Sequence, residues 1–305
     1  MIYHSQAPMA EEIAADITPL LSDRFEIGES PVWDEAHGSL LWCDIPRGEI
    51  HALRLEDGKR EAWRFGEPVG AFGLCRSRRL VVGLRDSVIL FDRASGNREM
   101  LAALPHRKPR MRLNDGKVGP DGAFYIGSMD ASGDGAPAAA FYRVGPDGAV
   151  RVLADGYTTT NGLAWSPDGR LMYHSDSRGP MALDRWDFDP ATGEANGRVR
   201  LGIIDETLGR ADGGACDLNG DYWSAAPSQS RLNQFDAEGQ LVGFIPMPTL
   251  RPTMPCFGGS DMRTLFVTSL SSGIDAETLA QHPLCGAIVT LRMPVAGVPV
   301  SRFAD

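Results

Sequence analysis

The hydrophobic positions of this sequence fall in short runs, and each run is bounded by a turn that contains glycine. A polar or small residue opens each unit, an apolar run follows, and a turn such as Pro167-Asp168-Gly169 leads into a second apolar run. The runs are rich in Val, Leu, Phe, Tyr and Trp, as half-buried β-strands require. Helical spacing of apolar residues is confined to a short segment around residues 276–281. The pattern therefore predicts an all-β protein.

This two-run unit repeats six times, so the strands are organised as a repeat architecture. The copies begin near residues 28, 70, 113, 160, 211 and 254. Their spacing of roughly 42 to 51 residues is the length of one four-stranded propeller blade. A β-sandwich of similar strand spacing is the alternative, but it would not explain an even sixfold return. We therefore expect a six-bladed β-propeller.

The repeat also indicates how the chain is divided. No linker rich in Ser, Gly or Pro interrupts the six copies, so we expect residues 17–305 to form a single propeller domain after an N-terminal extension of residues 1–16. Residues from about Ile17 to Phe25 precede the first copy. We expect them to supply the outer strand of the sixth blade, which would close the ring and protect a sheet edge.

Composition and charge indicate which kinds of partner, such as nucleic acid, membrane or small molecule, the protein can bind. The 305 residues include 30 Lys and Arg against 40 Asp and Glu, a net charge of −10, which argues against nucleic acid as the main partner. No apolar run approaches the roughly 20 residues of a membrane helix, and the N-terminus does not resemble a secretion signal. Five cysteines without CxxC spacing are typical of a reducing compartment. We expect a cytoplasmic protein, monomeric or homodimeric, that acts on a small molecule.

Candidate chemistry lies where the first strand of each blade begins, because that strand lines the central channel of a propeller. The six positions are Glu29, Gly70-Ala71, Asn114, Asn161, Asp212 and Met254-Pro255. Four of the six carry side-chain oxygens, and burying charged groups without a partner is costly. Two carboxylates and two carboxamides that converge there favour a hard divalent cation. Any one of these residues taken alone is as readily a turn residue that caps a strand end.

Other common sites are weakly supported or excluded by spacing. The six histidines include no HxxxH pair, which weakens the case for a histidine-rich zinc site. The sequence also lacks GxSxG and GxxxxGK[ST], so it has neither the nucleophile elbow of an α/β-hydrolase nor a P-loop.

Several phrases resemble the regucalcin/gluconolactonase family of sugar lactonases. They are GESPVW (28–33), RLNDGKVGPDGAFYIGSM (112–129), TNGLAWSPDGRLMYHSDS (160–177), ADGGACDLNGDYWSA (211–225) and PTMPCFGG (252–259). The phrases occur in the order of the family and extend over nearly the whole chain. The resemblance implies a six-bladed propeller with one divalent cation in the central channel, which agrees with the repeat count.

Carried over residue by residue, the resemblance implies that Glu29, Asn161 and Asp212 ligate the cation. Asp212 would also act as general base, while Arg112 and Asn114 would contact the substrate. We expect Asp115, next to Asn114, to bond the backbone amides of its turn. An all-oxygen ligand set suits Ca²⁺, Mn²⁺ or Mg²⁺, and Zn²⁺ or Fe²⁺ are tolerated by such ligands.

The expected function is metal-dependent hydrolysis of a sugar-acid lactone to the free acid in sugar catabolism. Glucono-, arabino- and galactonolactone are the simplest substrates. An arginine that reaches the channel would favour an acidic or sulfonated lactone instead, and four lie in the loops: Arg47, Arg178, Arg210 and Arg251. Two alternatives remain open, an organophosphate or aryl ester hydrolase and a calcium-binding regulatory propeller without turnover.

Overall fold

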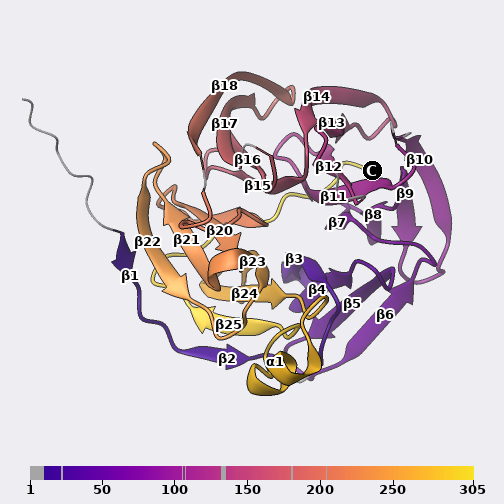
Figure 1. Ribbon diagram of the computed structural model, residues 1–305. Coiled ribbons are helices and arrows are strands. Elements are labelled where there is room, and N and C mark those ends of the chain that lie inside the picture. The colour runs from indigo at the N-terminus through magenta and orange to yellow at the C-terminus, as the bar shows by residue number, and fades with distance from the viewer. Residues whose placement is uncertain are drawn as a thin grey trace, which may run out of the picture.

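Six β-sheets surround a central axis, and four of them are built from consecutive segments of the chain while the other two also contain an N-terminal strand (Figure 1). The computed structural model describes residues 10–21, 23–104, 106, 108–131, 135–179, 181–203 and 205–305. The predicted all-β, six-bladed propeller is confirmed. Of the predicted N-terminal extension, residues 1–9 lie outside the described residues.

The first three blades follow the chain without interruption. Blade 1 contains β3 (Gly28–Asp34), β4 (Ser39–Asp44), β5 (Glu49–Arg54) and β6 (Arg60–Arg64). Blade 2 contains β7 (Ala71–Leu74), β8 (Arg79–Gly83), β9 (Ser87–Asp92) and β10 (Arg98–Ala103). Blade 3 contains β11 (Met111–Val118), β12 (Phe124–Asp130), β13 (Ala139–Val144) and β14 (Val150–Tyr157).

Two of the last three blades include a strand from the N-terminal part of the chain. Blade 4 contains β15 (Thr160–Trp165), β16 (Leu171–Asp176), β17 (Ala182–Asp189) and β18 (Glu194–Ile203). Blade 5 contains β19 (Gly214–Cys216), β20 (Tyr222–Ala226), β21 (Arg231–Phe235), β22 (Leu241–Pro246) and β1 (Glu11–Glu12). Blade 6 contains β23 (Pro252–Gly258), β24 (Thr264–Ser269), β25 (Val289–Arg292) and β2 (Ile17–Pro19).

Helical structure is limited to short segments. The helix α1 (Ala276–Gln281) lies where helical spacing predicts it, and its N-cap Asp275 accepts a hydrogen bond from the Thr278 amide. Two 3₁₀ turns cover Glu35–His37 and Pro227–Gln229. Within the described part of the chain, none of the helices has the length and apolar character needed to cross a membrane.

The six innermost strands, β3, β7, β11, β15, β19 and β23, pack side by side around the channel. Their first residues are neighbours around most of the ring: the Thr253 hydroxyl donates to the Gly28 carbonyl at 2.5 Å, and the Gly213 amide donates to the Thr253 carbonyl at 2.8 Å. All six strands therefore begin at the same end of the channel, which we call the mouth. We call the end where they finish the rear.

The ring closes through the N-terminal strand, as the sequence predicts. β2 pairs antiparallel with β25, with Ile17 opposite Leu291, and the Leu20 amide donates to the Ile288 carbonyl at 2.8 Å. The preceding β1 pairs in parallel with β22 and adds a fifth strand to blade 5. Figure 1 shows this N-terminal segment along the outside of blades 5 and 6.

The hydrophobic core is divided among the seams between neighbouring blades. Each of six buried clusters draws side chains from two adjacent sheets. At the seam between blades 6 and 1, Trp33 stacks on Phe266 with ring centroids 5.7 Å apart. Packing between blades thus fixes where each inner strand begins relative to the next, and so fixes the side chains at the mouth.

Candidate functional site

The predicted site residues stand at the mouth, at the start of four innermost strands. Glu29, Asn114 and Asn161 are buried near the first residues of β3, β11 and β15. Asp212 precedes β19 and is half-buried. Its amide donates to the Ala225 carbonyl at 2.9 Å, which fixes the backbone at this point.

A backbone irregularity follows three of these residues. The pairing of each innermost strand with its neighbour shifts register directly after Glu29, Asn114 and Asn161. The next residue in each case has a positive φ: Ser30 (+48°), Asp115 (+35°) and Gly162 (+71°). A β-bulge of this kind redirects a side chain and is common beside active sites. β7, which begins with apolar Ala71, pairs in regular register.

Hydrogen bonds link the predicted substrate and cation residues across three blades. Arg112 Nη1 donates to Asn114 Oδ1 at 2.8 Å, and Asn114 Nδ2 donates to Asn161 Oδ1 at 3.1 Å. Asn161 Nδ2 in turn donates to the Ser177 hydroxyl at 2.6 Å. That hydroxyl donates to the Ala211 carbonyl, one residue before Asp212. We call this series the polar chain of the mouth.

The carboxylates of the mouth repel one another. Burial raises the pKa of Glu29 well above its usual range, and the negative charges of Asp212 and Asp115 raise it further. Burial followed by the charge of Asp115 raises the pKa of Asp212 to about 8, against the lowering effects of the Gly213 amide and Arg112. Only the Ser30 amide, 2.6 Å from Oε2, donates to Glu29 among the described residues.

Asp115 contributes a third carboxylate that the sequence did not assign to the site. Its Oδ2 accepts a hydrogen bond from the Leu163 amide at 3.3 Å, so it bonds backbone as predicted, but the amide belongs to β15 of the next blade. Oδ1 is buried without a hydrogen-bond partner in the described residues. Burial raises the pKa of Asp115, while the charge of Lys117 and neighbouring amides lower it.

This donor set fits a divalent cation. Among the described residues, no Lys, Arg or His forms an ion pair within 4.0 Å of Glu29, Asp115 or Asp212. Buried carboxylates that raise each other's pKa are relieved by a bound positive charge, and oxygen donors suit hard cations. The described residues hold no group of three or more His, Cys, Asp or Glu arranged around a metal position. The predicted ligand set differs from such a group, because it combines two carboxylates with the carboxamide of Asn161.

Arg112 and Lys117 are the cations whose charges act on these carboxylates, Arg112 on Asp212 and Lys117 on Glu29 and Asp115. The Arg112 side chain is half-buried, and burial lowers its pKa to about 10, while the negative charges of Glu29 and Asp212 oppose that effect. Nη1 bonds Asn114 and the Leu113 carbonyl, at 2.8 and 2.9 Å. Within the described chain Nε and Nη2 have no hydrogen-bond acceptor, so the guanidinium retains donors for a ligand.

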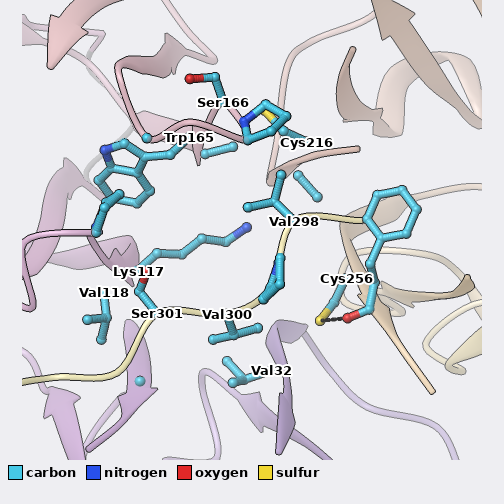
Figure 2. Close-up of a pocket in the computed structure, with 18 of the residues that line it drawn as sticks. Val32, Lys117, Val118, Trp165, Ser166, Cys216, Cys256, Val298, Val300 and Ser301 are labelled. Carbon is cyan, nitrogen blue, oxygen red and sulfur yellow. Dashed lines mark hydrogen bonds between the residues drawn. The ribbon is translucent and has the colours of Figure 1, made fainter. Parts of the chain in front are cut away.

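A separate cavity of about 290 Å³ lies at the rear (Figure 2). It is lined by the last residues of innermost strands, such as Val32, Val118 and Trp165, and by residues 298–301 of the C-terminal segment. Lys117 extends into it and donates a hydrogen bond to the Gly214 carbonyl. None of the predicted site residues lines this cavity. The chemistry predicted from sequence therefore belongs to the mouth and not to this cavity.

The four loop arginines named from the sequence differ in whether their side chains already have a partner. Arg47 pairs with Glu26 at 3.2 Å, Arg210 pairs with Glu206 at 3.2 Å, and Arg251 donates to the Ser272 carbonyl. The side chain of Arg178 has no partner among the described residues, and its amide donates to Asp176. Arg85, which sequence reasoning missed, is close enough to Arg112 for their positive charges to interact.

Comparisons with known proteins agree with the fold and identify the family. Residues 27–271 match the family described as the SMP-30/Gluconolactonase/LRE-like region. The chain is 35% identical over 282 residues to a 6-deoxy-6-sulfogluconolactonase of Pseudomonas putida, covering 91% of this chain and 95% of the relative. It is 30% identical over 293 residues to regucalcin of Xenopus laevis, covering 93% and 97%. A solved structure of regucalcin from Agrobacterium tumefaciens, described as a calcium-binding protein, superposes with a TM-score of 0.92 at 26% identity, covering 97% of this chain and all of that one.

Proposed function

The chain belongs to the SMP-30/gluconolactonase/LRE-like family, and from that premise we propose that it hydrolyses a sugar-acid lactone with the help of one divalent cation. Glu29, Asn161 and Asp212 would hold the cation at the mouth. Arg112 and Asn114 would bind the substrate. Ca²⁺, Mn²⁺, Mg²⁺, Zn²⁺ and Fe²⁺ are the candidates for the ion.

The observation that carries this proposal is the polar chain of the mouth. It joins Arg112 and Asn114 to Asn161 and ends one residue before Asp212, so substrate donors and cation ligands form one connected unit. The names of the relatives support the same substrate class, because one is a sulfogluconolactonase and the family description includes gluconolactonase.

A bound cation would supply Lewis-acid polarisation of the lactone carbonyl. The residues of the chain would handle the protons of the reaction. Asp212 accepts a proton from the attacking water as the water oxygen bonds to the carbonyl carbon. The bond from that carbon to the ring oxygen then breaks, and the ring oxygen receives the proton and leaves as the hydroxyl of the open sugar acid.

Arg112 and Asn114 have complementary roles in this reaction. The unbonded donors of Arg112 can hold sugar oxygens or the negative charge that develops on the substrate. Asn114 is fixed, because its Nδ2 donates to the Thr160 carbonyl and to Asn161 Oδ1 while its Oδ1 accepts from Arg112. Its Oδ1 keeps a lone pair that can accept from a sugar hydroxyl, and a polar group held in place in this way binds without the cost of reorganising.

A calcium-binding role without turnover is the second candidate, because the Agrobacterium relative is described as a calcium-binding protein. One experiment separates the two functions. The protein is stripped with a chelator, reloaded with each cation in turn, and assayed by pH indicator on glucono-, galactono- and arabinolactone. We expect hydrolysis that depends on the cation and an E29Q variant that needs more cation for half-maximal rate. Full activity in the stripped protein would rule out the cation-dependent mechanism, and cation binding without turnover of any lactone would favour the second candidate.

A further inference from the structure

Arg85 stands at the mouth beside the substrate end of the polar chain. It lies in the loop between β8 and β9 of blade 2, and its side chain is exposed. Its amide donates to Glu67 Oε2 at 3.2 Å, and its carbonyl accepts from the Leu113 amide at 2.9 Å and from His106 Nε2 at 2.5 Å. These three contacts fix the backbone of the loop, and the bond from Leu113 holds it against the residue that follows Arg112.

Arg85 and Arg112 are neighbours of like charge, because the Arg85 carbonyl accepts a hydrogen bond from the amide of Leu113, the residue after Arg112. Burial lowers the pKa of Arg112, and the charge of Arg85 contributes to the lowering. Among the described residues, neither arginine forms an ion pair with a carboxylate. By contrast Arg47, the arginine of the corresponding loop in blade 1, is paired with Glu26 and Asp44.

We propose that Arg85 and Arg112 together bind the acidic group of an anionic sugar lactone, a sulfonate, phosphate or carboxylate at the end of the sugar remote from the reacting carbonyl. This inference rests on the proposed lactonase function and adds the charge class of its substrate. It also assigns Arg85 as the residue that selects this class.

The chemistry of the pair suits an oxyanion with several oxygens. A guanidinium presents its donors in a planar fork that matches carboxylate, phosphate or sulfonate geometry. Arg112 is already oriented by Asn114, whereas Arg85 is exposed and bonds the neighbouring residues only through its backbone. An acidic group placed between them would remove the repulsion between two positive charges, which a neutral sugar does not do.

The test compares Arg85 with its counterpart in blade 1. Wild type, R85Q, R85E and the matched control R47Q are assayed on gluconolactone and on lactones that carry a sulfonate, a phosphate or a second carboxylate. We expect the wild type to prefer one or more of the anionic lactones, measured as the ratio of kcat/KM values. R85Q should reduce that ratio by about 10-fold or more, as the loss of a charge-assisted contact does. R85E should reduce it further, and R47Q should leave it unchanged.

Ionic strength gives an independent signature, because screening weakens a contact with an exposed charge. The preference of the wild type should fall between 0.05 and 0.5 M NaCl, which span a large change in Debye length of roughly 14 to 4 Å, and that of R85Q should not. A ratio that R85Q leaves unchanged, or that R47Q lowers equally, overturns the inference while lactone hydrolysis itself stands.

If none of the lactones is hydrolysed, the proposed function fails and the anion site is still decided by binding. The sulfonated aldonic acid, which cannot be hydrolysed, is titrated calorimetrically into wild type and R85Q. A dissociation constant that is at least about 10-fold weaker in R85Q supports the site. Equal affinities, or no binding to either protein, overturn it.

Discussion

The carboxyl of Asp212 responds to charges of both signs in the candidate site, because Asp115 raises its pKa and Arg112 lowers it. Its raised pKa of about 8 makes it a stronger base than an exposed aspartate once it has lost its proton. Glu29 is more deeply buried and is held by the Ser30 amide. Of the two predicted carboxylate ligands, Asp212 is therefore the one suited to accept a proton from water.

Substituting Asp212 separates cation binding from proton acceptance. D212A removes both roles, and D212N keeps an oxygen ligand but cannot accept a proton. We expect both variants to lose roughly 10²- to 10⁴-fold in kcat, the usual contribution of a general base, while D212N retains more of the cation affinity. Lactone turnover and calorimetric cation titration measure the two effects. D236N, in a turn at the rear, is the control, and a D212N variant with more than half of the wild-type rate would contradict the role.

Side chains at single positions were predictable where the repeat aligns them. Glu29, Asn114, Asn161 and Asp212 became candidates because each stands near the start of the innermost strand of a different blade. Their division into cation and substrate residues came from the family resemblance. Asp115 was assigned to its own turn, although its amide partner Leu163 lies on the next blade. Arg85 was missed for the same reason, because its importance comes from a neighbour 27 positions further on and no local pattern indicates it.

At the scale of the strand, the bulges decide where the site residues point. They follow Glu29, Asn114 and Asn161, whereas β7 pairs without a shift. β23, which carries no predicted site residue, also shifts register, between Pro252 and Met254. Two of the three bulges place a residue other than glycine at positive φ, which costs of order 1–3 kcal/mol and persists only where the surroundings enforce it. Sequence patterns do not reveal such strain, so the bulges were not predictable.

Gly162 tests whether the bulge positions Asn161. A Cβ at this residue would lie 2.4 Å from the Tyr222 hydroxyl and 2.5 Å from the Ser175 hydroxyl, at a φ of +71°. We expect G162A to lower the free energy of unfolding by roughly 1–3 kcal/mol and to weaken cation binding. Gly58 has a similar φ of +70° with nothing within 4 Å, so G58A reports the backbone cost alone. Equal stability losses and unchanged cation affinity in both variants would show that the bulge has no positioning role.

The strands of the six repeats were easier to predict from the sequence than the two N-terminal strands that pair with blades 5 and 6. From β3 to β25 the apolar runs and turn residues repeat at a regular spacing, and this spacing predicts the number of blades. β2 was expected because a ring needs a closing strand, and the structure confirms its pairing with β25. β1 has only Glu11 and Glu12 and joins the edge of blade 5 in parallel, so no alternation of apolar residues could indicate it.

The whole ring depends on this closure, because blade 6 takes its outer strand from the N-terminal part of the chain. Two truncations separate the contributions. Removal of residues 1–13 takes away β1 and leaves β2, whereas removal of residues 1–20 takes away both strands and the contact of Leu20 with the core seam. We expect the longer truncation to cost roughly 2–4 kcal/mol more in lost backbone bonds and apolar burial.

The difference is measured by denaturant unfolding of the two truncated proteins beside the full chain. The longer truncation also exposes the edge of β25, so we expect it to associate at high concentration, which light scattering detects. Equal midpoints for both truncated proteins would mean that the ring is stable without its closing strand.

The mouth also connects the stability of the whole molecule to pH. Without a cation, the folded state holds the proton of Asp212 up to a pKa of about 8, whereas an ordinary aspartate releases it near 3.8. The folded state therefore binds more protons than the unfolded state in this interval, and its stability falls as pH rises. The contribution of Asp212 is fully present below about pH 4 and is lost as pH rises through about 8.

A chelated sample should therefore lose stability between pH 5 and pH 8 more steeply than its D212N variant, in which residue 212 does not titrate. Asp57 is the matched control, because its bond to Arg54 lowers its pKa to about 2, so D57N should leave the slope in this interval unchanged. A divalent cation should raise the melting temperature most at the upper end of the interval, since its ligands must be deprotonated to bind. Parallel pH profiles for wild type and D212N, with no greater effect of the cation at pH 8 than at pH 5, would mean that these carboxylates do not share the charge of one bound ion.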